Sequence, residues 1–167
     1  MRICIVLAVA LAACSSGAKQ HDDAPATPVA PPVEAPKPAN QPKVSIDTPR
    51  GAITVDVEVV ATPAKIEKGL MYRQYLAPDA GMLFLMGKEK DWTFWMHNTL
   101  IPLDMIFIGK DMKVAGVVAN ATPRTDDHRS VGAASLYVLE VNGGWAAAHG
   151  IAAGASVKWD GVDAAAH

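Results

Sequence analysis

The hydrophobic pattern of residues 43–160 predicts a β-rich domain. Apolar and polar residues alternate along 53–59, and this period of two indicates a half-buried strand. Helical spacing is confined to a segment from Thr62-Pro63 to Tyr72-Arg73 and to the Ala-rich stretch 145–149. Further strands are predicted from short, bounded runs of apolar residues, at 44–46, 81–86, 92–96, 103–108, 113–119, 135–142 and 155–159. We therefore expect a mainly β fold, either a compact sandwich or an open barrel of about seven to eight short strands with two short helices.

Residues 1–13 have the pattern of a secretory signal. Arg2 precedes an unbroken apolar run that ends in small residues and is shorter than the roughly 20 residues of a membrane-spanning helix. The string that ends at Cys14, Leu-Ala-Ala-Cys, resembles the bacterial lipobox, which implies cleavage before Cys14 and acylation of Cys14. Two or more acyl chains give a stable anchor. The alternative is an ordinary secretory signal with an incidental cysteine.

Lipidation of Cys14 would place the chain in the bacterial cell envelope, facing the periplasm. Ser15 stands where an Asp signals inner-membrane retention in enteric bacteria, so the outer membrane is favoured. Residues 14–42 are predicted to be a disordered tether, because seven of the twelve prolines lie between Pro25 and Pro42. Residues 161–167 are expected to form a disordered tail.

The composition of the chain excludes several classes of function and of binding site. Fifteen basic against seventeen acidic residues leave a net charge of −2, which argues against a nucleic-acid partner. Because the two cysteines are Cys4 and Cys14, the domain has no residues for a disulfide, a cysteine-ligated zinc site or a cysteine nucleophile. The common hydrolase, zinc-protease and nucleotide-binding motifs are not found in the sequence. We therefore predict no cofactor and no metal site.

Four strings carry a resemblance to a known family. They are G-L-M-Y-R at 69–73, G-M-L-F at 81–84, F-W-M-H-N-T-L-I-P-L-D-M-I-F-I at 94–108 and Y-V-L-E-V-N-G-G at 137–144. In order and spacing they closely resemble the "domain of unknown function 192" over roughly residues 45–160. The resemblance implies a compact β-sandwich with short helices and no established activity. At the position of His97 this family more usually has a long basic or polar residue, so a mechanism that needs His97 would not be family-wide.

Two carboxylates in apolar strands are the main candidates for a site. Asp104 lies in L-D-M-I-F-I and Glu140 in V-L-E-V, where a charge is costly unless it is paired or hydrogen-bonded. They either line one pocket, as ligand-binding or acid–base groups, or accept structural bonds from backbone N–H groups or Arg73. Arg73 is either that counter-ion or an anion-binding group at the pocket mouth. The candidate pocket is completed by His97, Asn98 and Thr99, of which Asn98-Thr99 is alternatively a turn.

The leading hypothesis is a lipid-anchored envelope protein whose β domain binds an unidentified ligand or envelope protein without catalysis. One alternative is a small hydrolase or lyase that uses Asp104 and Glu140, with His97 assisting. Another is a periplasmic copper-handling protein, because six of the seven methionines lie between Met71 and Met112. Trp92 and Trp95 are expected on opposite faces of one strand, one exposed and one in the core.

Overall fold

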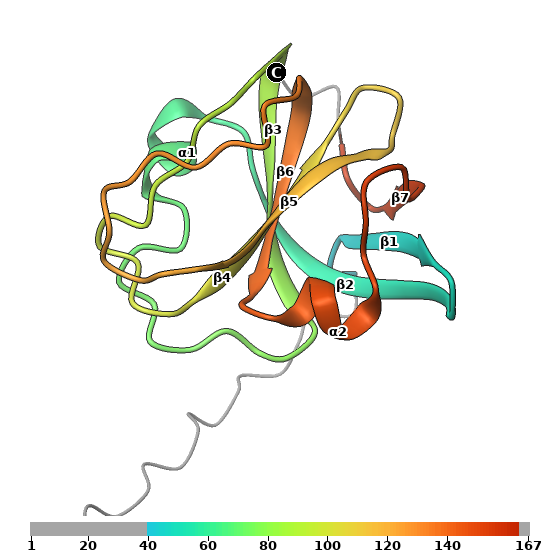
Figure 1. Ribbon diagram of the computed structural model, residues 1–167, viewed down its shortest axis with the longest axis horizontal. Helices are drawn as coiled ribbons and strands as arrows, with labels where there is room; N and C mark the ends of the chain where they lie inside the picture. The colour runs from blue at the N-terminus through green and yellow to red at the C-terminus, as the bar shows by residue number, and fades with distance from the viewer. Residues whose placement is uncertain (1–39, 164–167) are drawn as a thin grey trace, which may run out of the picture. The chain divides into compact units, whose positions relative to one another are not determined.

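The computed structural model describes residues 40–163 and contains a single curled β-sheet with two short helices (Figure 1). The strands are β1 (Lys43–Thr48), β2 (Gly51–Val60), β3 (Ala80–Lys90), β4 (Leu103–Ile108), β5 (Val114–Ala121), β6 (Ser135–Asn142) and β7 (Val157–Asp160). The helices are α1 (Pro63–Lys68), which connects β2 to β3, and α2 (Trp145–His149), which follows β6. The order of the strands in the sheet is β5-β4-β6-β3-β2-β1-β7.

The curvature of the sheet brings its two edges together. All neighbouring strands are antiparallel except β2 and β3, which are parallel and joined through α1. Lys113, before β5, forms a bridge with Ser156, before β7. Next to this bridge the Val157 N–H donates to the Met112 carbonyl at 2.8 Å. The mainly β prediction is confirmed, and of the two expected architectures the structure is an open barrel.

Both faces of the central strands are buried, because successive side chains point alternately into two hydrophobic clusters. We call them the barrel cluster, on the side of β1, β7 and α2, and the α1 cluster, on the side of α1. In β3, Leu83 and Leu85 face the barrel cluster, whereas Met82 and Phe84 face the α1 cluster. Figure 1 shows the two sides, with α1 and its neighbouring loops on one side of the central strands and β1, β7 and α2 on the other. The barrel cluster includes Val44, Ile46, Val55, Val57, Ile106, Ile108, Leu139 and Val141, and the α1 cluster includes Val60, Leu70, Leu76, Met96, Met105, Phe107 and Val138.

Asp104 faces the barrel cluster and holds three segments together. It is fully buried, and its carboxylate accepts the backbone N–H groups of Asn120 at 2.6 Å, Gly144 at 2.9 Å and Ala146 at 2.7 Å. These donors belong to the end of β5 and to the first turn of α2. Hydrogen bonds to a charged group stabilise a fold more than neutral ones do. Asp104 therefore has the structural role that was one of its two interpretations.

The predicted strand at 92–96 is not formed. Within it Phe94 makes one isolated bridge, to Arg129. The segment was mistaken for a strand because it is rich in aromatic residues. Trp92 and Phe94 are partly buried against one face of the sheet, which they cover from a loop, and Trp95 is exposed. The predicted helix is shorter than expected and ends at Lys68, because Gly69 has a φ of 44°, which a residue with a side chain rarely adopts; a Cβ there would also lie 3.2 Å from the Phe84 ring.

The barrel domain extends slightly beyond both ends of the predicted range, residues 43–160. The Pro42 carbonyl accepts the Val57 N–H at 2.8 Å, and Val162 packs against the barrel cluster. The predicted signal, Cys14 and most of the tether lie outside the described residues, as does 164–167. Within residues 40–163, neither helix has the length and hydrophobicity that crossing a bilayer requires.

Asp104→Asn is expected to lower the free energy of unfolding by about 3 kcal/mol, because an amide N–H₂ would face a backbone donor and the charge would be lost. Chemical denaturation of the purified chain measures this change. The control is Asp127→Asn, whose side chain is 84% exposed and whose change should stay within about 0.5 kcal/mol. Equal effects of the two variants would contradict the structural role of Asp104.

Candidate functional site

A pocket of about 180 Å³ lies on the α1 side of the sheet. It is bounded by α1 and the turn after it, by β3 and by residues 92–99. Pockets for drug-sized ligands usually measure about 300–1,000 Å³, so this one fits a small group or the end of a longer ligand. Its lining residues are Ile66, Glu67, Lys68, Gly69, Leu70, Met71, Phe84, Met86, Trp92, Thr93, Phe94, Trp95, Thr99 and Glu140.

Glu140 contributes the one carboxyl that reaches this pocket from the sheet. It alternates with Leu139 and Val141 along β6, so its side chain is on the α1 face, between the cross-strand neighbours Met82 and Met105. It is 4% exposed, and no residue within 40–163 gives it a hydrogen bond or an ion pair. Burial raises the pKa of Glu140 to about 8. The carboxyl is therefore largely protonated at neutral pH.

Four aromatic rings line the pocket around this carboxyl. Phe84 from β3 meets Phe94 edge-on, with 5.4 Å between the ring centroids. The Trp92 indole N–H donates to the Lys88 carbonyl at 3.0 Å, which fixes the ring beside the end of β3. Trp95 is 44% exposed and extends the wall to the surface. The two tryptophans thus share one pocket, contrary to expectation, because residues 92–96 form a loop in which neighbouring side chains are not forced to opposite faces.

The loop that carries these rings is held in place by a second loop. Phe94 and Arg129 exchange two backbone hydrogen bonds, at 2.9 and 2.8 Å, and the Met96 N–H donates to the Thr125 carbonyl at 3.0 Å. The charged segment 122–130 therefore supports the pocket wall. On the other side the Tyr72 N–H donates to the Asn98 carbonyl at 2.9 Å, which ties the turn after α1 to the same loop. These contacts preform the pocket.

Two of the predicted site residues, Glu140 and Thr99, line this pocket. Thr99 is buried, and its hydroxyl lies 3.4 Å from the His97 carbonyl oxygen. His97 and Asn98 line a neighbouring, more open depression of about 420 Å³. There the His97 ring stacks on Trp95 and its Nδ1 lies 2.7 Å from Asp126, while the Asn98 amide donates to the Tyr72 hydroxyl at 2.8 Å.

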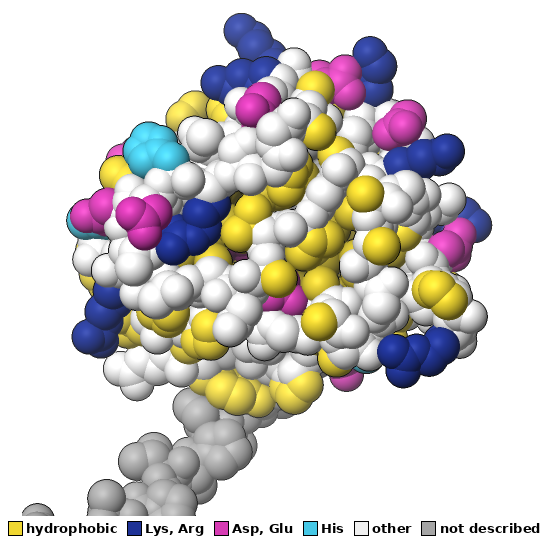
Figure 2. Space-filling view, viewed as in Figure 1, with side chains coloured by type: hydrophobic (Ala, Val, Ile, Leu, Met, Phe, Trp, Pro, Cys, Tyr) yellow, Lys and Arg dark blue, Asp and Glu magenta, His cyan; other side chains and the backbone are white. Residues whose placement is uncertain are grey.

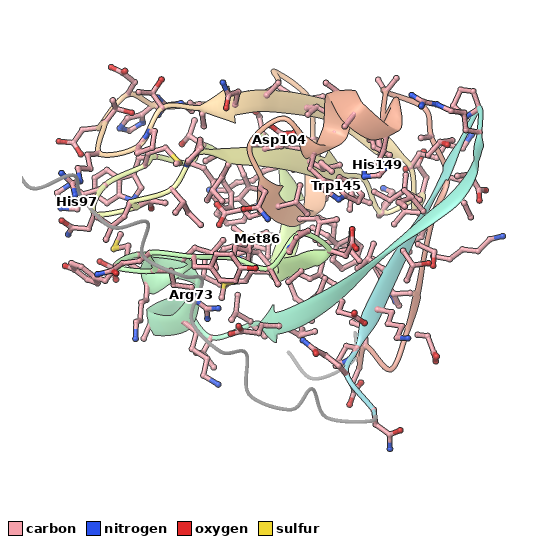
Figure 3. The ribbon with its side chains drawn as sticks, turned by 90° about the horizontal axis from the view of Figure 1, so that it is seen from below. Arg73, Met86, His97, Asp104, Trp145 and His149 are labelled. Carbon is pink, nitrogen blue, oxygen red and sulfur yellow. The ribbon has the colours of Figure 1, made fainter. Side chains whose placement is uncertain are left out.

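Arg73 and Asp104, the other two predicted site residues, line neither of these two pockets. Figure 3 shows Asp104 beside α2 with Trp145 and His149, whereas Arg73 lies next to α1. Asp104 pairs with Val141 across the β4–β6 ladder, so it points to the opposite face of the sheet from Glu140. The sheet separates the two carboxylates, and they do not form one acid–base site.

Arg73 has a different partner from the two that the sequence suggested. Its guanidinium makes two hydrogen bonds to Glu58, one of them 2.6 Å long, and these bonds lower the pKa of Glu58. Glu58, Met82 and Glu140 are successive cross-strand neighbours on β2, β3 and β6. Two strand spacings, about 10 Å, therefore separate the Glu58–Arg73 pair from Glu140.

Sequence reasoning missed the aromatic walls, and above all Phe84 and Phe94. Phe84 lies in a strand and Phe94 in a loop, so their convergence depends on how the loop folds back over the sheet. The available signal was the density of aromatic residues at 92–95, which was interpreted as a strand core. Met86 also lines the pocket from β3. Among residues 40–163, no three His, Cys, Asp or Glu side chains group closely enough to hold a metal.

The fold and pocket define a small open-barrel domain with a single buried carboxyl in an aromatic pocket. The chain belongs to the DUF192 family, described as "Uncharacterized ACR", whose sequence profile matches residues 45–159. The expected family is thereby confirmed, and its fold here is a barrel. Comparison with curated proteins gives no match.

Among the solved structures that are similar to this chain are proteins from Sinorhizobium meliloti and Novosphingobium aromaticivorans. A Sinorhizobium meliloti protein, provisionally described as a transcription regulator, is 35% identical, with a TM-score of 0.69 over 73% of this chain and 95% of that one. A protein of unknown function from Novosphingobium aromaticivorans is 41% identical, with a TM-score of 0.68 over 70% of this chain and 84% of that one. The barrel is thus shared with proteins of related sequence.

Stability is expected to fall with rising pH because of Glu140. The unfolded carboxyl loses its proton near pH 4.5, whereas the folded one keeps it to about pH 8. Between these values folding binds a proton, so the free energy of unfolding decreases by up to about 1.4 kcal/mol per pH unit as the pH rises. In Glu140→Gln this component should be absent, and the variant should be more stable than the parent at pH 8.

Denaturation at pH 5, 6, 7 and 8 measures this slope. Glu67→Gln is the control, because Glu67 lies exposed on α1 at the rim of the same pocket. It should retain the slope of the parent chain. A Glu140→Gln variant with the same slope as the parent would contradict the buried, unpaired state of Glu140.

Proposed function

We propose that this chain is a lipid-anchored cell-envelope protein whose barrel domain binds a small ligand, or one end of a larger ligand, in the Glu140 pocket without turning it over. The segment before Ser15, with its lipobox-like string, supports the anchor and the envelope location. The preformed pocket supports binding. The net charge of −2 argues against a nucleic-acid ligand, and Figure 2 shows acidic and basic side chains intermixed on the face in view.

The single observation behind the binding proposal is the state of Glu140. A buried carboxyl without a partner costs stability, and a protein that only needed to fold would gain from an apolar residue there. Such costs are typical of functional sites, where a ligand supplies the missing partner. Among residues 40–163, Glu140 has no hydrogen-bonding partner and borders a pocket, whereas Asp104 is satisfied within the fold.

A non-catalytic role is favoured over hydrolysis. The hydrolase or lyase alternative relies on Asp104 and Glu140 together, and Asp104 lies across the sheet from Glu140, so the two cannot act on the same substrate atoms. The other ionisable residues at the pocket, Glu67 and Lys68, are exposed on α1. The copper alternative has less support, because Met82 and Met105 are buried in the α1 cluster, as gap-filling methionines usually are.

The anchoring proposal is tested at Cys14. Cys14→Ala is expected to release the chain from the membrane fraction or to leave it uncleaved, because the acyl chains attach through this thiol. Metabolic labelling with a fatty acid and membrane fractionation measure both effects. Cys4→Ala is the control and should remain labelled and membrane-bound. A Cys14→Ala chain that is still labelled and still membrane-bound would refute the anchor.

The binding proposal is tested with a panel of amines, carboxylic acids, alcohols and amides of up to six heavy atoms. Protein-detected NMR is expected to show that at least one class shifts the resonances of Trp92, Trp95 and Thr99. Trp95→Ala should weaken that binding about fivefold or more, because a ring contact contributes roughly 1 kcal/mol. Tyr75→Ala is the matched control, since Tyr75 is 43% exposed and lies outside the lining of the pocket.

Two outcomes would contradict ligand binding in this pocket. One is a panel in which no compound shifts the three reporter resonances. The other is equal weakening in Trp95→Ala and Tyr75→Ala, which would place the contact elsewhere on the surface.

A further inference from the structure

We infer that the group bound in the Glu140 pocket is an ammonium ion, primary or methylated, at the end of an alkyl chain. This inference rests on the proposed ligand-binding function and names the chemical class of the ligand. It depends on three features of the pocket: the aromatic lining, the carboxyl at the floor and the small volume.

The aromatic lining favours a cation. The rings of Phe84, Trp92, Phe94 and Trp95 surround a space that the Met71 and Met86 side chains also border. Aromatic faces are electrically negative and attract ammonium groups, and clusters of such rings are the usual means of recognising methylated ammonium. One of these rings already attracts an ammonium group, because Lys90 Nζ, which is not part of the pocket lining, lies 3.8 Å from the centroid of the Trp92 ring.

The carboxyl at the floor selects for the sign of the charge. An anionic ligand would meet Glu140, and the one cationic side chain of the lining, Lys68, is exposed at the rim, while Arg73 is bound to Glu58 outside the pocket. A sugar needs several hydrogen-bonding groups, whereas the buried polar side chains in the lining are Glu140 and Thr99. An ammonium ion supplies what Glu140 lacks, which is an opposite charge in a desolvated site.

The volume limits what enters. About 180 Å³ is below the range for drug-sized ligands, so a compact head group is admitted and the remainder of a longer molecule stays outside. The neighbouring depression of about 420 Å³, bordered by Ala64, Trp95 and His97, offers a path for that remainder. The two spaces have Glu67, Lys68, Met71 and Trp95 in common.

Ammonium binding should be coupled to release of the Glu140 proton. The empty pocket holds the neutral acid at pH 7, because burial raises its pKa to about 8, whereas a bound cation favours the carboxylate. The affinity for a permanent cation should therefore rise up to tenfold per pH unit below pH 8 and level off above it. A neutral ligand that accepts a hydrogen bond from the protonated acid should show the opposite trend.

The other charged groups near Glu140 do not provide this dependence. Glu67 and Lys68 on α1 have opposite charges and are exposed at the rim. Lys90, at the end of β3, contacts the Trp92 ring. Glu58 on β2 is neutralised by Arg73, two strands away.

Tetramethylammonium and tert-butanol test the inference, because they have nearly the same shape and differ in charge. Each is titrated into the purified chain at pH 6, 7, 8 and 9, with the Trp92, Trp95 and Thr99 resonances as reporters. Tetramethylammonium should bind up to tenfold more tightly at pH 7 than at pH 6, change less than threefold between pH 8 and pH 9, and outcompete tert-butanol at pH 8. Glu140→Gln should lose at least tenfold in tetramethylammonium affinity together with the pH dependence, and Glu67→Gln should keep both.

Further outcomes separate this inference from the function on which it rests. Tighter binding of tert-butanol than of tetramethylammonium would overturn the ammonium class and leave ligand binding in place. Binding of neither probe would overturn the class as well, and the panel of small compounds then decides whether the pocket binds any ligand. Phosphatidylcholine vesicles that displace tetramethylammonium would assign the ammonium to a lipid head group, and failure to displace it would assign a soluble amine; both results support the class.

Discussion

Burial of both faces of the central strands is the constraint on which this structure depends. All six residues of β4 are buried, and β3 and β6 likewise send alternate side chains into two separate hydrophobic clusters. A polar side chain in the buried part of these strands is largely removed from bulk water, so it finds partners inside the protein, borders a pocket or retains an uncompensated cost. Asp104 finds three backbone donors on one face. Glu140, on the other face, finds none within the described residues and borders a pocket instead.

The two carboxylates illustrate how similar sequence contexts lead to different roles. Asp104 closes the barrel side, because its donors come from the end of β5 and from the turn that starts α2, and these segments are thereby fixed relative to β4. The α1 side is closed by a short helix and by loops. The aromatic side chains of those loops cover the sheet without continuing it, which leaves a space above Glu140.

Much of the fold was predictable from local pattern. The alternation along 53–59, the apolar runs at 81–86 and 103–108 and the Ala-rich segment at 145–149 all correspond to elements in the structure. Proline at the start of α1 and Gly69 at its end explain the bounds of that helix. The segment 92–96 was mistaken for a strand because strands and loops that cover a sheet can have the same aromatic composition. A strand differs from such a loop in that its backbone pairs with a neighbouring strand.

The candidate site was less accessible to sequence reasoning. The residue types alone identified Asp104 and Glu140 as unusual, because charge in an apolar strand is costly wherever the strand lies. Their separation depended on strand register: Asp104 is opposite Val141 and not Glu140, and a shift of one residue exchanges the two faces of a strand. The partner of Arg73 also depended on tertiary structure. Arg73 binds Glu58, which lies on β2, the strand that pairs in parallel with β3. Local pattern thus established that the chain is β-rich and which polar residues are exceptional, whereas long-range pairing decided which of them meet, because contacts between distant strands leave no periodic trace in a single sequence.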